Sequence, residues 1–301
     1  MILEQAIFGY RELIGHTLLS LSAPHVEELV DELSNLTDLP GNPPYGVTWK
    51  PYVSGYPVGD FYAVSRTLID ADATRGDTVY SYVILIRKED IDGVDNLKHI
   101  VDLLPESIDK SAQADQIIFE SEDNSIVNSS VNSELVFQLS NKEDKAIICL
   151  GNSEDYIESI CSIWNKLWGN IRYKFTFKIG FNSEKVTSDD TIVISPLNLK
   201  HEWIGFPIVE LDGRKVLQSE VELWLEGNSE LSEPLMAFWD QVNHGESTFS
   251  DLKFQFEKQP GHRDLERLTG CSWDKLNQMK TVVINGMTNE GLEQPLTNKQ
   301  S

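Results

Sequence analysis

The chain has 301 residues, and its 48 acidic residues outnumber its 25 lysines and arginines, which gives a formal net charge of −23. Phosphate contacts and anionic membrane surfaces both demand clustered basic residues, so the charge argues against a nucleic-acid binder and against a membrane-docking protein. Hydrophobic residues make up 40% of the chain, enough for a sizeable core, and the length suits two domains or one large one.

The first 105 residues predict strands with interspersed helices. Apolar residues at 2–8 predict a strand that Gly9 ends, and leucines at 18–21 predict a second strand. A helix is expected from Ser22, with Pro24 in its first turn and apolar residues at helical spacing behind it. Three more strands and a helix are expected over residues 47–53, 61–68, 78–86 and 88–104. The links between residues 45 and 86 are too short for parallel crossovers, which favours antiparallel pairing there.

Residues 106–132 are rich in Ser, Asn, Asp and Glu and predict a long loop or linker. Residues 89–123 hold 11 acidic residues against 2 lysines. Repulsion among these charges favours an extended, solvated chain.

Ordered structure is expected again at residues 134–139 and in a buried strand at 146–150. A helix with a wide apolar stripe is expected to begin at Ser153 and to end at Gly169. Alternation over residues 173–179 predicts a half-buried strand with its aromatic residues inward, and a short strand follows at 191–194. The expected core residues of this region are Trp164, Trp168, Phe175 and Phe177.

The last third is expected to be extended over residues 202–211 and helical over 216–225, 231–242 and 263–280, with a frayed tail. Residues 210–258 form a second acidic block, with 11 acidic residues against 4 basic ones. The predicted fold class is α+β, with a mixed, mostly antiparallel sheet, flanking helices and a more helical C-terminal part. The expected division is an α+β domain or subdomain at 1–105, an acidic loop or linker at 106–132, a continuation of the α+β core at 133–195, and a C-terminal region at 196–301.

The sequence holds no phosphate-binding, zinc-protease or serine-hydrolase motif. Three scattered cysteines, Cys149, Cys161 and Cys271, argue against a disulfide framework. A base–nucleophile pair of His16 with Cys149 or Cys161 is an alternative, but both cysteines lie in apolar strings. Acid pairs such as Asp189-Asp190 arise by chance among so many acids. We therefore expect no catalytic, cofactor or metal site.

No apolar run reaches the roughly 18 residues of a membrane span, and the N-terminal residues lack the basic stretch of a signal peptide. We therefore expect a soluble, cytoplasmic protein with no membrane contact.

One group of loop residues is a candidate for recognition. Arg, His and Tyr in loops between strands serve recognition when exposed, and form a satisfied polar network when buried. The many acids of the chain offer internal partners for Arg11, which favours a structural lock over a recognition role. The group comprises Tyr10, Arg11, His16, Tyr56, Arg66 and Arg75.

The same residues lie in motifs that resemble a known family. The motifs are Gly9-Tyr10-Arg11 with Gly15-His16, Thr37-Asp38-Leu39-Pro40-Gly41, Gly55-Tyr56-Pro57, Tyr62 to Thr67, and Arg75-Gly76 with the strand that follows. They resemble the GTPase-associated protein N-terminal domain family (type 1) of bacterial conflict and defence gene clusters. A second block resembles the family at Ile163-Trp164, Leu167-Trp168, Ile171-Arg172 and Phe175 to Phe177, so the resemblance covers about residues 1–195. Leu13-Ile14 is an insertion, and Tyr82 stands where members often carry His.

The resemblance implies a non-catalytic adaptor, scaffold or regulatory subunit of an antiphage complex, which works with a GTPase, another NTPase or an effector. Acidic faces suit a basic protein partner. Two alternatives stay open. One is an enzyme of unrecognised type with a cleft around Arg11, His16 and Arg75. The other is an acidic inhibitor or DNA mimic, whose acids should form a continuous stripe.

Overall fold

The computed structural model describes residues 1–24, 27–73, 75–120, 131–142, 144–167, 169–217 and 220–227. The chain divides into two compact units, residues 1–253 and 254–301, and all the described residues lie in the first. The helices expected at 231–242 and 263–280 therefore lie outside the described residues, as does Trp168.

The N-terminal half of the sheet is antiparallel. Its main strands are β1 (Ile2–Arg11), β2 (Gly15–Leu21), β3 (Tyr52–Val58), β4 (Phe61–Ile69) and β5 (Val79–Arg87). β3, β4 and β5 pair in sequence, β1 adds beside β5, and β2 pairs with β1. The short strand β6 (Ile117–Ile118) pairs with the start of β1. The expected antiparallel pairing between residues 45 and 86 is confirmed.

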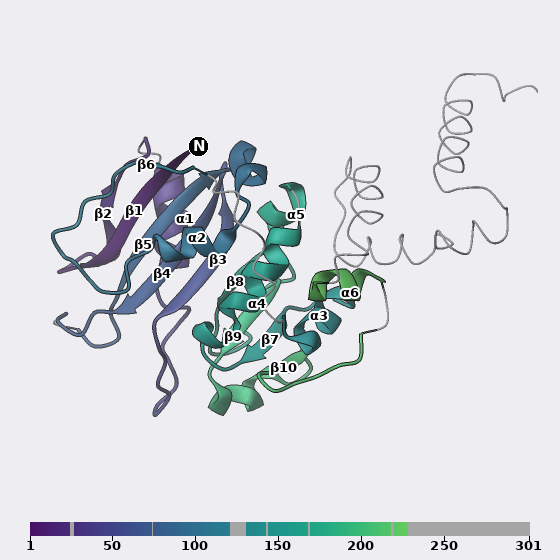
Figure 1. Ribbon diagram of the computed structural model, residues 1–301. Helices are drawn as coiled ribbons and strands as arrows, with labels where there is room; N and C mark the ends of the chain where they lie inside the picture. The colour runs from purple at the N-terminus through teal and green to yellow at the C-terminus, as the bar shows by residue number, and fades with distance from the viewer. Residues whose placement is uncertain are drawn as a thin grey trace, which may run out of the picture. The chain divides into compact units, whose positions relative to one another are not determined.

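The C-terminal half of the sheet is parallel. Its strands are β7 (Ile147–Leu150), β8 (Phe177–Ile179), β9 (Ile192–Ser195) and β10 (Ile208–Glu210). The full order is β10-β7-β9-β8-β3-β4-β5-β1-β2 (Figure 1). The two halves join at one pair, Gly55 of β3 with Phe177 of β8. A mixed sheet that is mostly antiparallel in its N-terminal half confirms the predicted fold class.

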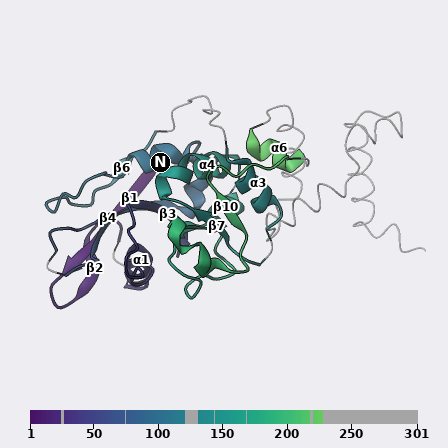
Figure 2. The ribbon, with the colours of Figure 1, turned by 90° about the horizontal axis from the view of Figure 1, so that it is seen from below.

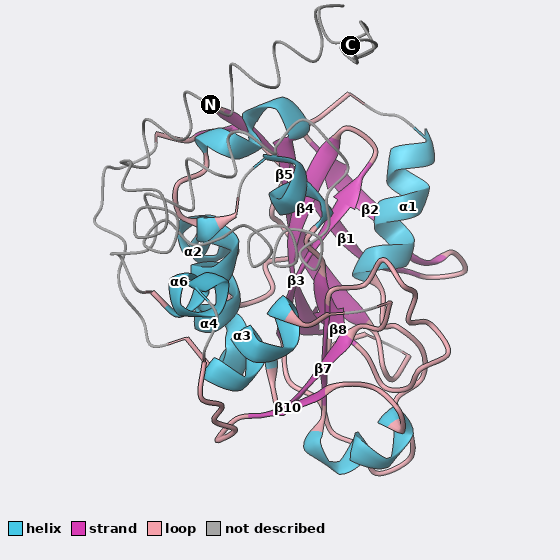
Figure 3. Cartoon of the chain, turned by 90° about the vertical axis from the view of Figure 1, so that its right-hand side faces the viewer, coloured by secondary structure: helices cyan, strands magenta, loops and turns pink. Residues whose placement is uncertain are grey.

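Helices cover both faces of the sheet. Figure 3 shows α1 on one side and α2, α3, α4 and α6 on the other, and Figure 2 shows α1 and α4 on opposite sides of β3. The α-helices are α1 (Glu27–Thr37), α2 (Leu97–Asp102), α3 (Ser133–Ser140), α4 (Ser153–Lys166), α5 (Gly169–Lys174) and α6 (Glu220–Glu226). Two 3₁₀ helices are described, η1 (Lys88–Gly93) and η2 (Leu197–Trp203).

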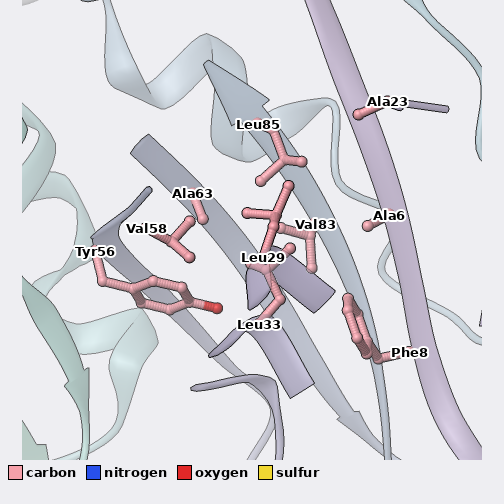
Figure 4. Close-up of a cluster of buried hydrophobic side chains, with 10 residues drawn as sticks. All are labelled: Ala6, Phe8, Ala23, Leu29, Leu33, Tyr56, Val58, Ala63, Val83 and Leu85. Carbon is pink, nitrogen blue, oxygen red and sulfur yellow. The ribbon is translucent and has the colours of Figure 1, made fainter. Parts of the chain in front are cut away.

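The α1 side of the sheet holds a compact apolar cluster. Leu29 and Leu33 point from α1 onto Phe8, Tyr56 and side chains of β4 and β5 (Figure 4). The spacing of four residues places both leucines on one helix face, so the helix docks through a single stripe.

On the opposite side, Trp164 of α4 is fully buried and its ring lies 5.9 Å from that of Tyr62. Phe175 and Phe177 are buried as well.

Several predicted boundaries in the N-terminal half are wrong for local reasons. β1 continues through Gly9, because this glycine permits close approach rather than a turn: an added Cβ would lie 2.8 Å from Leu19 Cδ1. The strand expected from residue 47 begins only at Tyr52, directly after Pro51, which lacks the N–H that a ladder needs. The helix expected from Ser22 is described from Glu27. The helix expected at 88–104 is interrupted between η1 and α2.

In the second half, the stretch at 134–139 is a helix, α3. Gly169 begins α5 instead of ending α4, and α5 takes up the first residues of the strand expected at 173–179, so that β8 keeps only three residues. The stretch at 202–211 is extended only in β10, and the helix expected at 216–225 is α6.

The described part of the acidic segment lies against the sheet. Tyr80 donates its hydroxyl hydrogen to the Asp109 carbonyl at 3.1 Å, and the Asp109 amide donates to the Tyr82 hydroxyl at 2.8 Å. These bonds fasten the segment across β5, so its acids are held beside the folded core.

Candidate recognition cleft

A cleft of about 460 Å³ opens where four connections meet. Its walls come from the β1–β2 hairpin, the loop after α1, the β4–β5 loop and the loop between β8 and β9. Three of the predicted candidates, Tyr10, His16 and Arg75, line it together with Asp38 and Lys185. The sheet thus brings together side chains that are more than 170 positions apart in the sequence.

His16 is the most constrained side chain of the cleft. Its Nε2 lies 2.9 Å from the Thr37 hydroxyl, which itself donates to the Leu33 carbonyl at 2.8 Å. Because that hydroxyl hydrogen is already committed, His16 Nε2 carries the hydrogen and donates to Thr37. The imidazole ring also stacks against Phe8, with centroids 6.0 Å apart. The ring therefore has a fixed position and a fixed tautomer.

Burial lowers the pKa of His16 below its ordinary 6.5, while the Asp38 carboxylate and the Val79 carbonyl act in the opposite direction. The net effect is a neutral imidazole at neutral pH. Its Nδ1 atom is buried and has no hydrogen-bond partner among the described residues. The charges of the cleft then come from Arg75, Lys185 and nearby carboxylates, not from the histidine.

A chain of buried hydroxyls connects His16 to the middle of the sheet. Ser81 donates to the Thr37 carbonyl at 2.8 Å, and the hydroxyls of Thr67 and Ser81 lie 2.9 Å apart. Thr67, Ser81 and Thr37 are all fully buried. The end of α1 is therefore tied to β4 and β5, and this bonding holds the cleft wall rigid.

Arg11 lies outside the cleft lining, at the end of β1, and its side chain is exposed. Within the described part of the chain it forms no ion pair, so no described carboxylate holds Arg11 in the way that the structural lock requires. The hairpin turn beside it exposes two large apolar side chains, Leu13 at 99% and Ile14 at 67%.

Tyr56 and Arg66 lie apart from the cleft. Tyr56 is buried in the α1-side cluster, and its hydroxyl faces Ser65 Oγ at 3.4 Å. Arg66 lines a second cavity of about 380 Å³ on the other side of the sheet, where it donates to the Val101 carbonyl at 3.1 Å and pairs with Glu106 at 3.2 Å. Their contacts hold loops and helices onto the sheet.

Sequence reasoning missed the arginine that does act as a lock. Arg172 is buried, donates to the carbonyls of Ile91, Val94 and Asn165, and lies over the Trp164 ring at 4.7 Å. Burial lowers the pKa of this guanidinium. Arg172 follows the apolar stripe of α4 in the sequence, and a charged residue in such a position can indicate a buried contact. From the sequence alone, a strand is instead expected to begin directly after Arg172.

The described residues offer little for metal or thiol chemistry. Burial raises the pKa of the Cys149 and Cys161 thiols, which keeps both protonated. No group of three His, Cys, Asp or Glu side chains among the described residues is arranged to hold a metal ion. In the same part of the chain, no helix has the length and apolarity that crossing a bilayer requires.

These features define a mixed α/β protein with a cleft on its antiparallel strands. Residues 2–104 match the model of the family described as GTPase-associated protein 1, N-terminal domain type 1. The match confirms the resemblance for the first third of the chain, and the motif block at 163–177 lies beyond it. No curated protein matches the chain.

Proposed function

We propose that this chain is a non-catalytic adaptor or regulatory subunit that binds a GTPase, or another NTPase or effector, in a bacterial antiphage complex. The name of the matched family supports the partner class. The site that supports binding is the β1–β2 hairpin tip, residues 11–14, together with the adjoining cleft. Both lie almost entirely within the matched segment.

The observation that carries the proposal is the hairpin tip. Leu13 is almost fully exposed and has φ of 69°, a left-handed conformation that glycine or asparagine adopts with less strain. A turn selected for stability alone has no use for a large apolar residue in this conformation. Strained, exposed apolar residues of this kind are typical of surfaces that a partner covers.

The cleft favours binding over catalysis. A general base needs an accessible lone pair within hydrogen-bond reach of its substrate. The lone pair of His16 is on Nδ1, which is buried, and its Nε2 hydrogen is held by Thr37. An enzyme built on His16 and Arg75 would need to break the packing that holds the ring. Direct binding through the cleft rim needs no such change.

The experiment is co-purification of the full chain with a GTPase or other NTPase, the first candidates being any that neighbouring genes encode. Replacing Leu13 and Ile14 by aspartate should weaken the complex by about tenfold or more, since two apolar contacts become buried charges. The matched control is Ile204→Asp, an 87% exposed apolar residue in the parallel half, which should leave binding unchanged.

Equal binding by the hairpin variant and the wild type would refute the assignment of the surface. Nucleotide hydrolysis by the purified chain alone would refute the non-catalytic role. Plaque counts on phage-challenged cells that carry either the wild-type chain or the hairpin variant test whether the complex acts in defence.

A further inference from the structure

We propose that the candidate cleft binds a carboxylate of the partner, from an Asp or Glu side chain, through Arg75 and Lys185. The inference rests on the proposed function, since it names the chemistry by which the partner is recognised. Arg75 lines the cleft from the β4–β5 loop, and Lys185 lines it from the loop between β8 and β9. Guanidinium and ammonium groups both pair with carboxylates, and a guanidinium can hold both oxygens at once.

The side chains of Arg75 and Lys185 are exposed, and neither forms an ion pair within the described part of the chain. Most other described lysines and arginines are engaged. Ion pairs hold Lys50, Arg66, Arg87, Lys98, Lys110, Lys178, Lys200 and Lys215. Carbonyl oxygens or aromatic rings contact Lys88, Lys142, Lys145, Lys166 and Arg172. The cleft thus presents two cations that an external anion can reach.

The cleft has carboxylates of its own, and they do not occupy these two cations. Asp38 and Asp77 line the cleft, and neither forms an ion pair among the described residues. The Asp38 carboxylate instead accepts the Leu39 amide hydrogen at 2.8 Å. The chain carries a net charge of −23, so its field repels a doubly charged phosphate about twice as strongly as a carboxylate. This difference favours a singly charged carboxylate that pairs directly.

Gly76 indicates that a ligand approaches the backbone of the cleft. Its backbone is not in the left-handed region, and an added Cβ would have no atom within 4 Å, so neither its conformation nor a close neighbour requires glycine. Gly76 lines the cleft and directly follows Arg75 in the chain. An open glycine at such a position is typical of close approach by a ligand. A methyl group at this position would take up space that the ligand needs.

The cleft continues the surface of the hairpin tip. Tyr10 and Gly15 line the cleft, and they lie directly on either side of the tip, residues 11–14. A partner segment that covers the exposed side chains of Leu13 and Ile14 therefore passes the cleft within a few residues. The segment that fits both features carries an Asp or Glu close to apolar residues.

The direct test measures peptide binding to the full-length chain by fluorescence anisotropy. The probe is a labelled nine-residue peptide with a central glutamate, a leucine on each side of it and serine elsewhere. Two control peptides carry glutamine or phosphoserine in place of the glutamate. The glutamate peptide should bind about fivefold more tightly than the glutamine peptide, because glutamine has the same shape without the charge. The phosphoserine peptide should bind no more tightly than the glutamate peptide.

Variants of the cleft give changes of opposite sign. Arg75→Gln with Lys185→Gln should abolish the preference for glutamate over glutamine. The matched control, Lys174→Gln with Arg214→Gln, removes an exposed lysine and an exposed arginine outside the cleft lining and should keep the preference. Asp77→Asn should tighten binding of the glutamate peptide about twofold by removing a repelling carboxylate. Asparagine also tolerates the φ of 58° at this position, so folding is not at risk.

Gly76→Ala should weaken binding of the glutamate peptide about threefold or more, while urea unfolding follows the wild type. Equal affinity for the glutamate and glutamine peptides would overturn the inference. So would tighter binding of the phosphoserine peptide, because the cleft would then belong to a phosphorylated segment.

A GTPase complex that forms equally well with the Arg75 and Lys185 double variant removes this inference and leaves the proposed function intact. Glutamate-specific binding in the cleft without any NTPase or effector complex does the reverse.

Discussion

Gly55 joins the two halves of the sheet, and replacing it by alanine should destabilise the protein at this junction. It is the one residue of β3 that pairs with β8, opposite Phe177. An added Cβ would lie 2.3 Å from Phe177 Cε1 and 2.6 Å from the Tyr62 hydroxyl oxygen. Both distances are far below van der Waals contact, and both neighbours are fully buried.

Neither neighbour has room to move. Tyr62 is held by its hydroxyl, which donates to the Phe175 carbonyl at 2.8 Å, and Phe177 is fully buried in the β8 strand that pairs with Gly55. Overpacking of a filled core costs about 1–3 kcal/mol, and a clash with two fixed rings belongs at the upper end. Gly55→Ala should therefore lower the free energy of unfolding by about 3 kcal/mol.

The assay is urea unfolding of the full chain, followed by tryptophan fluorescence. Phe177→Leu removes the atoms nearest the new methyl group, so the double variant should be more stable than the sum of the single effects by about 1–2 kcal/mol. Gly76→Ala is a useful comparison, because no atom lies within 4 Å of the added Cβ there and the backbone of Gly76 is not in the left-handed region. Wild-type stability of Gly55→Ala, or strict additivity with Phe177→Leu, would refute the reasoning.

Trp164→Ala should cost about 3–5 kcal/mol in the same assay, because it empties a fully buried aromatic site; an unchanged midpoint would contradict the packing described. Arg172→Met should cost about 1–3 kcal/mol by leaving buried carbonyls unpaired, and full stability of this variant would show that water replaces the guanidinium. The lowered pKa of His16 means that the unfolded chain takes up this proton more readily than the folded one, so its stabilising contribution is present above pH 6.5 and lost as the pH falls through the folded-state pKa. Melting temperatures measured from neutral to acidic pH should therefore fall less steeply for His16→Gln than for wild type, while the exposed His201→Gln should follow wild type.

The local pattern of apolar residues was sufficient to predict the strands and helices whose buried faces recur at a regular spacing. β5 is buried at eight of its nine positions, and apart from Ser81 these eight are apolar or aromatic, which is typical of a central strand. α4 was recognisable from the stripe that includes Trp164. Antiparallel order between residues 45 and 86 followed from loop length alone.

The features that pattern could not supply depend on tertiary context. Gly9 and Gly169 both look like breaks, yet one permits close strand packing and the other begins a helix, because neighbours decide what a glycine does. The parallel half of the sheet depends on which strands pair, which no local period encodes.

The candidate cleft was predictable in part. Tyr10, His16 and Arg75 share a loop-borne, polar character that marks recognition residues, and the fold places all three on one cleft. Lys185 reaches the same cleft from the far half of the chain and carried no signal. Arg11 and Arg172 show that the role of an arginine depends on its burial, which the sequence does not give. Arg11 is exposed, whereas Arg172 is buried and hydrogen-bonded to backbone carbonyls.

The contacts of β3 show that the folded unit extends beyond the segment that matches the family. The matched segment stops at residue 104, yet the Val53 amide of β3 donates to Ser153 Oγ at 3.0 Å, and Gly55 pairs with Phe177. The matched segment can therefore keep its fold only if residues from the second half of the chain continue to contact β3 at these two positions. Whatever follows this domain in other chains has to close the same strand, so relatives with unrelated second halves should still supply a hydroxyl and an aromatic ring at that edge.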